Sequence, residues 1–282
     1  MAVRIVTDSS CDLPRDLVAT LGIEVVPLTI RFGDEEYVDG QDLSPDEFWS
    51  KMETSTVLPE TAAPSAGAFE AAFRSLAEDG ADGIVCVNLS AKLSATLQSA
   101  QVGAKALADS GNDCRVEIVD SATVSLAQGN LARRAAEAAA EGADIDTVVK
   151  QVETLRDRSR LFGALDTLEN LKKGGRVGGA QALLGSMLSI KPVVAVENGQ
   201  VEPWARVRTR SKALRWLVDK VKEEGTVEDL AILHGNAPEV DQLVEMFEPL
   251  YPPDDIVIGV VGPVVGTHAG PRVIGVTYHT AG

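Results

Sequence analysis

Residues 83–121 read GIVCVNLSAKLSATLQSAQVGAKALADSGNDCRVEIVDS, and this stretch decides the fold. It opens with a short apolar run at 83–89, continues with a helical pattern at about 93–108, and returns to a strand pattern at 115–119. Short apolar strands that alternate with helices are typical of crossover units, in which successive strands are parallel. The stretch therefore predicts a parallel sheet covered by helices.

The same alternation extends from this stretch to the N-terminus and on to about residue 160. It predicts that residues 1–160 form an α/β domain, a doubly wound, mostly parallel sheet with helices on both faces. Asp12 is expected to cap a first helix that Gly22 ends, and Ser44-Pro45-Asp46-Glu47 is a capping box. The other predicted elements are strands at 3–6 and 23–32, a hairpin at 33–37, a loop at 58–65, and helices at 65–80, 124–141 and 145–159.

Near residue 160 the regular alternation of strands and helices ends, and strands joined by turns follow. We therefore expect residues 161–282 to form a second, smaller α+β domain. Asn198-Gly199 between two apolar runs is a strong signal for a β-hairpin. The tail, residues 255–278, predicts two strands around a glycine-rich loop. These features favour a mixed or antiparallel sheet in this domain.

The composition limits the class of protein. The 282 residues carry 26 Lys and Arg against 42 Asp and Glu, a net charge of −16, which argues against binding nucleic acid over a broad surface. Cys11, Cys86 and Cys114 are far apart, so neither a zinc ribbon nor a thioredoxin-type site is expected. No apolar run reaches about 18 residues and no signal-peptide pattern is present, so we expect a cytoplasmic protein without a membrane helix.

The signatures of several common enzyme classes are missing. The sequence has no P-loop, no dinucleotide fingerprint after a strand, no nucleophile elbow and no zinc-spaced pair of histidines. We therefore expect neither a metal nor a cofactor.

Three polar loops follow predicted strands, at residues 7–14, 88–94 and 120–125. The carboxyl ends of parallel strands form the ligand crevice of an open sheet, and hydroxyl groups near helix N-termini suit an anion. A fourth loop, 262–271, adds glycines that let the backbone approach a ligand closely, and one imidazole, His268. Each residue alone is explained more simply as a cap or a turn, but together the loops favour a binding site.

A series of short motifs runs in order along nearly the whole chain. These are Thr7-Asp8-Ser9, Asp12-Leu13-Pro14, Pro59-Glu60-Thr61, Pro64-Ser65, Leu93-Ser94-Ala95-Thr96, Val119-Asp120-Ser121, Leu168-Glu169-Asn170, Gly174-Gly175-Arg176, Ile190-Lys191-Pro192 and Gly266-Thr267-His268-Ala269-Gly270-Pro271. With this series the sequence resembles the DegV family, the bacterial fatty-acid-binding proteins also called FakB.

The resemblance implies that a long-chain fatty acid, C14 to C18, is held between the two domains. Its carboxylate would be hydrogen-bonded by Thr61, Ser94 and, more distantly, His268. The family acts as a carrier without catalysis of its own and presents the acid to a separate ATP-dependent fatty acid kinase, which makes an acyl-phosphate. Arg176 and Arg208 match the family's kinase-docking arginines, and the family leads us to expect a monomer.

The sequence departs from the family pattern beside the carboxylate ligands. It has Thr61-Ala62-Ala63-Pro64-Ser65 where the family usually has Thr-Ser-Gln-Pro-Ser, and Ser94-Ala95-Thr96-Leu97 where it usually has Ser-Gly-Thr-Tyr. Arg272 replaces the glycine that usually follows the last Gly-Pro. These differences affect the expected acyl-chain preference more than the class of ligand.

The charge is distributed unevenly along the chain. Residues 172–222 hold eleven basic and three acidic side chains, a net +8, which leaves −24 on the remainder. Such asymmetry suggests a positive surface that steers an acidic partner or makes transient contact with anionic lipid. The alternative is a solvated helix face beside a hairpin.

The energetics favour an acyl ligand over a small acid. Each buried methylene contributes about 0.8 kcal/mol, so the chain would dominate affinity and the polar trio would select the carboxylate. None of the three expected ligands is Lys or Arg. We expect neutral donors to satisfy the carboxylate without locking it in a salt bridge, which suits transfer to a kinase.

Two other functions stay open on the sequence alone. In a serine-dependent acyl ester hydrolase, Ser94 would be the nucleophile, His268 the base and Asp8 or Asp120 the orienting carboxylate. An interaction or transcriptional module is the other alternative, although the acidic chain shows no helix-turn-helix signal and no nucleic acid partner is expected.

Overall fold

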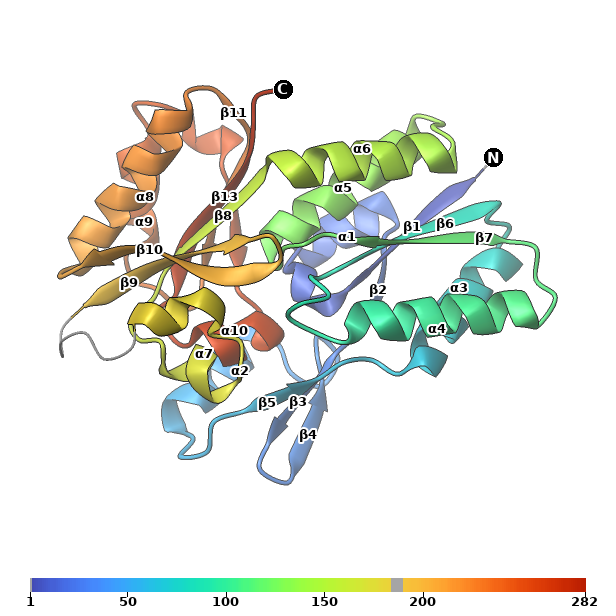
Figure 1. The fold of residues 1–282 in the computed structure, drawn as a ribbon, viewed down its shortest axis with the longest axis horizontal. Coiled ribbons are helices and arrows are strands. Elements are labelled where there is room, and N and C mark those ends of the chain that lie inside the picture. Colours follow the sequence, from blue (N-terminus) through green and yellow to red (C-terminus); the bar gives the residue numbers. More distant parts are fainter. Residues whose placement is uncertain (1, 184–189) are drawn as a thin grey trace.

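The computed structural model describes residues 2–183 and 190–282, which contain three β-sheets (Figure 1). One sheet has four parallel strands, one has six strands of mixed direction, and one has three antiparallel strands. Figure 1 places the four-stranded sheet on the right, the six-stranded sheet on the left and the small sheet below them. The α/β fold class predicted from the sequence is confirmed.

The two central strands of the four-stranded sheet carry apolar residues on both faces. Its order is β2 (Glu24–Val26), β1 (Val3–Asp8), β6 (Gly83–Asn88) and β7 (Arg115–Asp120). Ile84 and Cys86 pack on one face with helices α3 (Ala66–Glu78) and α4 (Thr96–Asp109). Val85 and Val87 pack on the other with α5 (Leu126–Ala140) and α6 (Ile145–Arg158). Side chains alternate between the faces of a strand, so this sheet is doubly wound as predicted.

The predicted strand at 23–32 is wrong in one respect, because it is broken at Pro27. Its first part is β2, while its second part, β3 (Thr29–Phe32), pairs with β4 (Glu35–Val38) in the three-stranded sheet. Proline has no backbone N–H to donate, so it favours this break. The third strand of that sheet, β5 (Glu60–Ala62), lies in the segment predicted as a loop.

The first two helices differ in how they begin. The capping box before α2 (Pro45–Thr54) is present, with Ser44 and Glu47 bonding each other's backbone. Helix α1 (Arg15–Leu21) instead begins after Pro14 without a side-chain cap, so the capping role predicted for Asp12 is wrong. Asp12 has a left-handed backbone, φ 52°, and follows the short 3₁₀ helix η1 (Ser9–Cys11).

The six-stranded sheet combines hairpins with one parallel pair. Its order is β10 (Gln200–Val207), β9 (Lys191–Glu197), β8 (Ser159–Ala164), β13 (Ile274–Thr280), β11 (Val227–His234) and β12 (Val257–Val260). The hairpin predicted at Asn198-Gly199 joins β9 and β10, and both residues have positive φ, 48° and 79°. Helices α8 (Arg210–Glu224) and α9 (Val240–Phe247) cover the outer face, where residues such as Phe162 and Ile232 form a second core.

The glycine-rich segment at 262–271 is more regular than the sequence indicates. It folds into the short helix α10 (Pro263–Ala269), whose first residue is a proline with its φ already set for a helix. A second short helix, α7 (Glu169–Lys173), packs beside it, followed by the 3₁₀ turn η2 (Gly178–Leu183). The last 3₁₀ turn is η3 (Pro253–Asp255).

The chain leaves the four-stranded unit at the end of α6 and enters the six-stranded sheet directly through β8. A division into domains at residue 160 stays a prediction. In residues 2–183 and 190–282, no helix combines the length and the apolar character needed to cross a bilayer.

Candidate functional site

An apolar cavity of about 210 Å³ lies between the six-stranded sheet and the first half of the chain. Its wall on the sheet side comes from Leu161 and Gly163 of β8 and from Leu165, directly after that strand, with neighbours on β9, β10 and β11. The opposite wall includes Leu89 and Leu93 of the loop after β6. Most of the lining is Leu, Val and Ala, so the cavity suits a hydrocarbon.

A few polar side chains interrupt the apolar lining. Thr61 of β5, Ser94 of the loop before α4 and His268 of α10 all line the cavity, and the hydroxyl of Thr61 lies 2.9 Å from Nε2 of His268. These residues come from distant segments of the chain and meet through tertiary structure. The structure thus brings Thr61 and His268 into contact and places Ser94 on the same wall, while their role as carboxylate ligands stays a prediction.

The surroundings of His268 keep its ring neutral. Burial, with the positive charge of Arg176 nearby, lowers the pKa of His268 to about 4. Its Nδ1 is buried and has no hydrogen-bond partner in the described part of the chain. An N–H left without an acceptor is costly, so we place the proton on Nε2, where it is donated to Thr61. The Thr61 hydroxyl proton is then free for a ligand.

We expect the ligand-free protein to show a His268 that titrates near pH 4. Burial opposes the charged form of the ring, so the pKa lies below that of a free histidine. An NMR titration of the ring signals measures it, and the variant His268→Gln assigns the signal by removing it. A midpoint near 6.5 would show that the ring is solvated and would remove the basis for a neutral donor.

Ser94 has a structural partner as well as a place on the cavity wall. Its Oγ lies 2.9 Å from Oγ1 of Thr96 and accepts a hydrogen bond from the Thr96 backbone N–H at 3.2 Å. These contacts join Ser94 to Thr96, the first residue of α4. The Ser94 hydroxyl keeps a proton that it can direct either to Thr96 or to a ligand.

A second, more polar depression of about 450 Å³ adjoins the polar end of the cavity. Thr61, His268 and Arg176 line both spaces, so they form the partition between them. The guanidinium of Arg176 is held in place, because Nε donates to the carbonyl of Leu93 at 3.1 Å and Nη1 to that of Gly174 at 2.6 Å. Thr61 therefore lies between the apolar cavity and a more polar depression.

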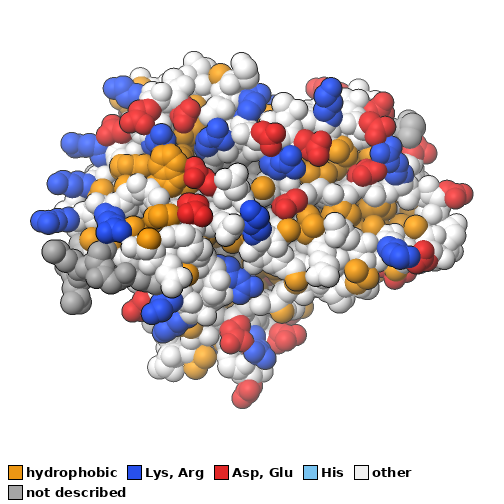
Figure 2. All heavy atoms as spheres, in the orientation of Figure 1, with side chains coloured by type: hydrophobic (Ala, Val, Ile, Leu, Met, Phe, Trp, Pro, Cys, Tyr) orange, Lys and Arg blue, Asp and Glu red, His pale blue; other side chains and the backbone are white. Residues whose placement is uncertain are grey.

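Arg208 is far less constrained. It follows β10, is exposed, and forms no ion pair within the described residues. Figure 2 shows Lys and Arg side chains along the left edge of the molecule, over α8 and the β9–β10 hairpin. The exposed members of this basic face are Arg206, Arg208, Lys212, Arg215 and Lys222. Three other basic residues of the segment are ion-paired: Lys191 with Asp166 at 2.9 Å, Arg210 with Asp166 and Glu239, and Lys220 with Glu223.

The polar loops after β1 and β6 mainly hold the scaffold. Asp8 is fully buried and accepts hydrogen bonds from Ser10, Asn88 and the backbone N–H of Leu89. This fixes the loop whose Leu89 and Leu93 line the cavity. Of the two roles considered for these loop residues, Asp8 therefore has the structural one, as an internal cap.

Asp12 connects the two halves of the molecule. Its carboxylate accepts hydrogen bonds from the hydroxyl of Ser125, before α5, and from the backbone N–H of Gly262, before α10, the latter at 2.9 Å. Burial raises the pKa of Asp12 to about 8, although these two hydrogen bonds lower it. Asp12 thus anchors the start of the helix that carries His268.

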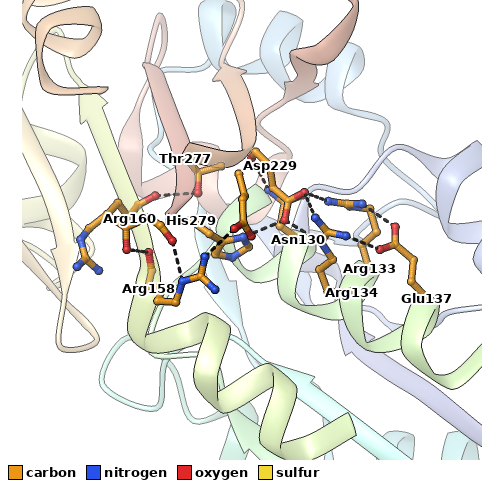
Figure 3. A network of polar contacts seen from close by, with 11 residues as sticks. Asn130, Arg133, Arg134, Glu137, Arg158, Arg160, Asp229, Thr277 and His279 are labelled. Carbon is orange, nitrogen blue, oxygen red and sulfur yellow. Dashed lines mark hydrogen bonds and ion pairs between the residues drawn. The ribbon is translucent and has the colours of Figure 1, made fainter. Parts of the chain in front are cut away.

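A polar network between α5 and the six-stranded sheet was missed by sequence reasoning (Figure 3). Asp229 of β11 contacts Arg133 at 2.5 Å, Arg134 at 2.8 Å and Nδ1 of His279 at 3.0 Å. Its side chain is only 8% exposed. Burial alone would raise its pKa, but hydrogen bonds from His279 and Arg134 and both arginine charges hold the pKa of Asp229 well below its usual range. Asp229 lies at a β-bulge with a positive φ of 54°. No pattern in the neighbouring residues indicates this conformation or the contacts that Asp229 makes.

The residues named for a hydrolase do not form a triad in this arrangement. His268 contacts Thr61 through Nε2, and its Nδ1 lacks a partner in the described residues. Asp8 is satisfied by the loops around it, and Asp120 accepts from the backbone N–H groups of Ala91 and Ala122. A triad needs the base bonded to both a nucleophile and a carboxylate, so the geometry does not support this alternative.

Comparisons with known proteins agree along the full length of the chain. The family model described as "Uncharacterised protein, DegV family" matches residues 2–281. A DegV domain-containing protein of Streptomyces coelicolor is 36% identical and one of Listeria monocytogenes is 32% identical, with coverage of 97% and 98% of both chains. The fold matches a Thermus thermophilus DegV family protein with a TM-score of 0.90 at 32% identity, and Bacillus subtilis DegV with 0.88 at 28%, each covering 100% of both chains. Both of these structures are described as fatty-acid-binding.

Proposed function

The chain belongs to the DegV family, and from this premise we propose that it binds a long-chain fatty acid and presents the carboxylate to a separate ATP-dependent kinase. The observation that carries the proposal is the apolar cavity whose lining includes Thr61, Ser94 and His268, with Thr61 and His268 in contact. Relatives at 28% identity or more that are described as fatty-acid-binding support the class of ligand.

Different residues of the cavity would bind the acyl chain and the carboxylate. The Leu and Val walls bury the acyl chain, here C14 to C18, at about 0.8 kcal/mol per methylene before ordering costs. The hydroxyls of Thr61 and Ser94 donate to the carboxylate, and Nε2 of His268 orients Thr61 by donating to its oxygen. These neutral donors satisfy the carboxylate without pairing it with a cation.

The proposed presentation to a kinase is supported by the polar depression that adjoins Thr61, Arg176 and His268. In the kinase's active site, a carboxylate oxygen attacks the γ-phosphorus of ATP, a new P–O bond forms, and ADP leaves with the electrons of the broken bond. The carrier contributes position only. The polar depression beside Thr61 gives the kinase access, and Arg176 with Arg208 and the basic face support docking of an acidic surface. Transient contact with anionic lipid, a monomeric state and a cytoplasmic location complete the proposal.

Mass spectrometry tests the binding step. Purified protein measured under native and then denaturing conditions should lose a mass equal to a C14 to C18 fatty acid. Delipidated protein should regain that mass when palmitate or oleate is added. Delipidated, folded protein that takes up neither acid would overturn the proposal.

Replacing the hydroxyl donors tests the head-group site. We expect Thr61→Val and Ser94→Ala each to weaken palmitate binding about tenfold or more, since a hydrogen bond to a charged group is worth about 1.5–3 kcal/mol. A displacement titration measures the effect. Ser50→Ala is the matched control, because the Ser50 hydroxyl only bonds the carbonyl of Asp46 within α2. Equal affinities for all three variants would rule out these carboxylate ligands.

A coupled assay tests presentation separately. Loaded protein, ATP and purified bacterial fatty acid kinase should give acyl-phosphate, trapped with hydroxylamine as the hydroxamate. Arg208→Glu should slow this reaction while leaving palmitate affinity unchanged, because Arg208 is exposed and lies outside the lining of the cavity. Unimpaired transfer by this variant would exclude Arg208 from docking.

A further inference from the structure

Gly163 occupies an unusual place in the wall of the cavity. It lies inside β8, between Leu161 and Leu165, and all three residues line the cavity. Its direct neighbours across the sheet are Val194 of β9 and Gly275 of β13. Figure 1 shows β8 and β13 side by side in the middle of this sheet. A glycine inside a central strand weakens that strand, so the position calls for a reason.

The backbone does not supply that reason. Gly163 has no positive φ, so an ordinary residue fits its conformation. Two other glycines in the same row of the sheet are needed for packing. A Cβ on Gly275 would overlap the carbonyl oxygen of Phe162, and one on Gly259 would lie 2.5 Å from Cδ1 of Leu126.

A Cβ on Gly163, by contrast, would meet no atom within 4 Å. Among the described glycines whose φ is not positive, Gly163 is the one with this open space. Since its neighbours on β8 line the cavity, the space that its missing side chain leaves is part of the cavity itself. The glycine therefore widens the cavity at this point of the wall.

The position of Gly163 along the cavity follows from the chain. After Leu165 the chain leads into α7, which ends at Lys173, and a Cβ on the next residue, Gly174, would lie 2.9 Å from Cε1 of His268. On the same side, β13 follows α10 and begins at Ile274, which pairs with Ala164 at the end of β8. Leu161 lies on the far side of Gly163, about 6.7 Å further along the strand. An acyl chain that starts at the polar end thus passes Gly163 before it reaches Leu161.

We propose that Gly163 determines the acyl-chain length that the cavity accepts, by leaving the passage towards Leu161 open. The proposal rests on the proposed function of fatty acid binding and adds a residue that selects among fatty acids. A side chain at this position would narrow the passage and exclude the part of a long chain that lies beyond it. Affinity should fall about fourfold for each methylene that is no longer buried.

A series of variants of increasing size tests the proposal. Delipidated wild-type protein, Gly163→Ala, Gly163→Val and Gly163→Leu are each offered an equimolar mixture of C10 to C18 saturated acids. The bound acids are identified by mass spectrometry. We expect the preferred chain to become shorter as residue 163 becomes larger, with affinity for stearate falling at least tenfold in Gly163→Val. Thermal unfolding checks that each variant is folded, and Gly163→Ala and Gly163→Val are sufficient if Gly163→Leu does not fold.

Two further variants separate a local effect from a general one. Ala205→Val adds bulk to the opposite face of the same sheet, where Ala205 packs against the outer core, and should bind like the wild type. Val194→Ala, added to Gly163→Val, removes bulk from the neighbouring strand and should restore longer chains.

The outcomes distinguish this proposal from the one on which it rests. Folded Gly163 variants that keep the wild-type chain-length profile would overturn the role of Gly163 while leaving fatty acid binding intact. Wild-type protein that binds none of the acids would overturn the proposed function, and the chain-length role with it.

Discussion

Gly174→Ala is expected to weaken fatty acid binding at least tenfold, although residue 174 itself need not touch the ligand. Gly174 follows α7 and lies against the ring of His268. A Cβ there would overlap Nδ1 and lie 2.9 Å from Cε1 of the ring, with the Asn170 carbonyl oxygen 3.2 Å away on another side. The alanine cannot be accommodated unless the imidazole moves.

Movement of the imidazole would disturb the Thr61 hydroxyl. Nε2 of His268 and Oγ1 of Thr61 are 2.9 Å apart, a normal hydrogen-bond length that a shift of the ring would break. The hydroxyl would then lose the partner that orients it towards a carboxylate. The loss of one well-aligned hydrogen bond to a charged group corresponds to about tenfold or more in affinity.

The measurement is a displacement titration with palmitate, alongside a double-mutant cycle. In a His268→Ala background, Gly174→Ala should cost little more, because the ring with which it collides is gone. Gly67→Ala in α3 is the matched control, since its nearest atom, Oγ of Ser65, is 3.8 Å from the new Cβ. Equal losses from Gly174→Ala in both backgrounds would show that the effect does not pass through His268.

Asp229→Asn is expected to lower the free energy of unfolding by about 3–5 kcal/mol at pH 7. The substitution keeps the shape of the side chain, and asparagine also tolerates the positive φ of this position. What it removes is the negative charge that Arg133, Arg134 and His279 share. Glu137 stays paired with both arginines, but two positive charges then share one carboxylate at a site that is little exposed, which is the reason for the cost.

The effect should depend on pH with a defined sign. The folded-state pKa of Asp229 is depressed, so its contribution is fully present above the unfolded value of about 3.9 and is lost as pH falls through the folded value. The stability difference between the wild type and Asp229→Asn should therefore narrow as the pH falls below about 4. Urea denaturation at several pH values measures it.

A surface aspartate provides the control for this experiment. Asp157 pairs with Arg156, but its side chain is 74% exposed, so Asp157→Asn should change stability by less than about 1 kcal/mol. A loss of similar size in both variants would mean that general electrostatics, and not the network between α5 and the six-stranded sheet, governs the result.

The elements of the fold were largely readable from local patterns. Three predictions that rest on only a few consecutive residues are confirmed: the strand at 83–89, the capping box at Ser44 and the turn at Asn198-Gly199. The errors lie where a local pattern is ambiguous. Pro27 divides one apparent strand between two sheets, and a glycine-rich tract forms the helix α10.

The candidate site was accessible from the sequence only in part. Thr61, Ser94 and His268 were named by resemblance to a family, and nothing in their spacing of 33 and 174 residues indicates that they share one cavity. The contact between Thr61 and His268 requires β5 to pair with β3 and α10 to pack beside α7.

The sequence by itself determined the α/β class, the acidic character with its basic segment, and most helices and strands. These properties depend on composition and on interactions between residues close in the chain. Only the tertiary structure decided the cavity, the pairing of Thr61 with His268, the bonds of Asp12, the Asp229 network and the open space at Gly163. Each of these arises where segments far apart in sequence approach within a few ångströms. A local sequence pattern does not indicate which distant segments come into contact.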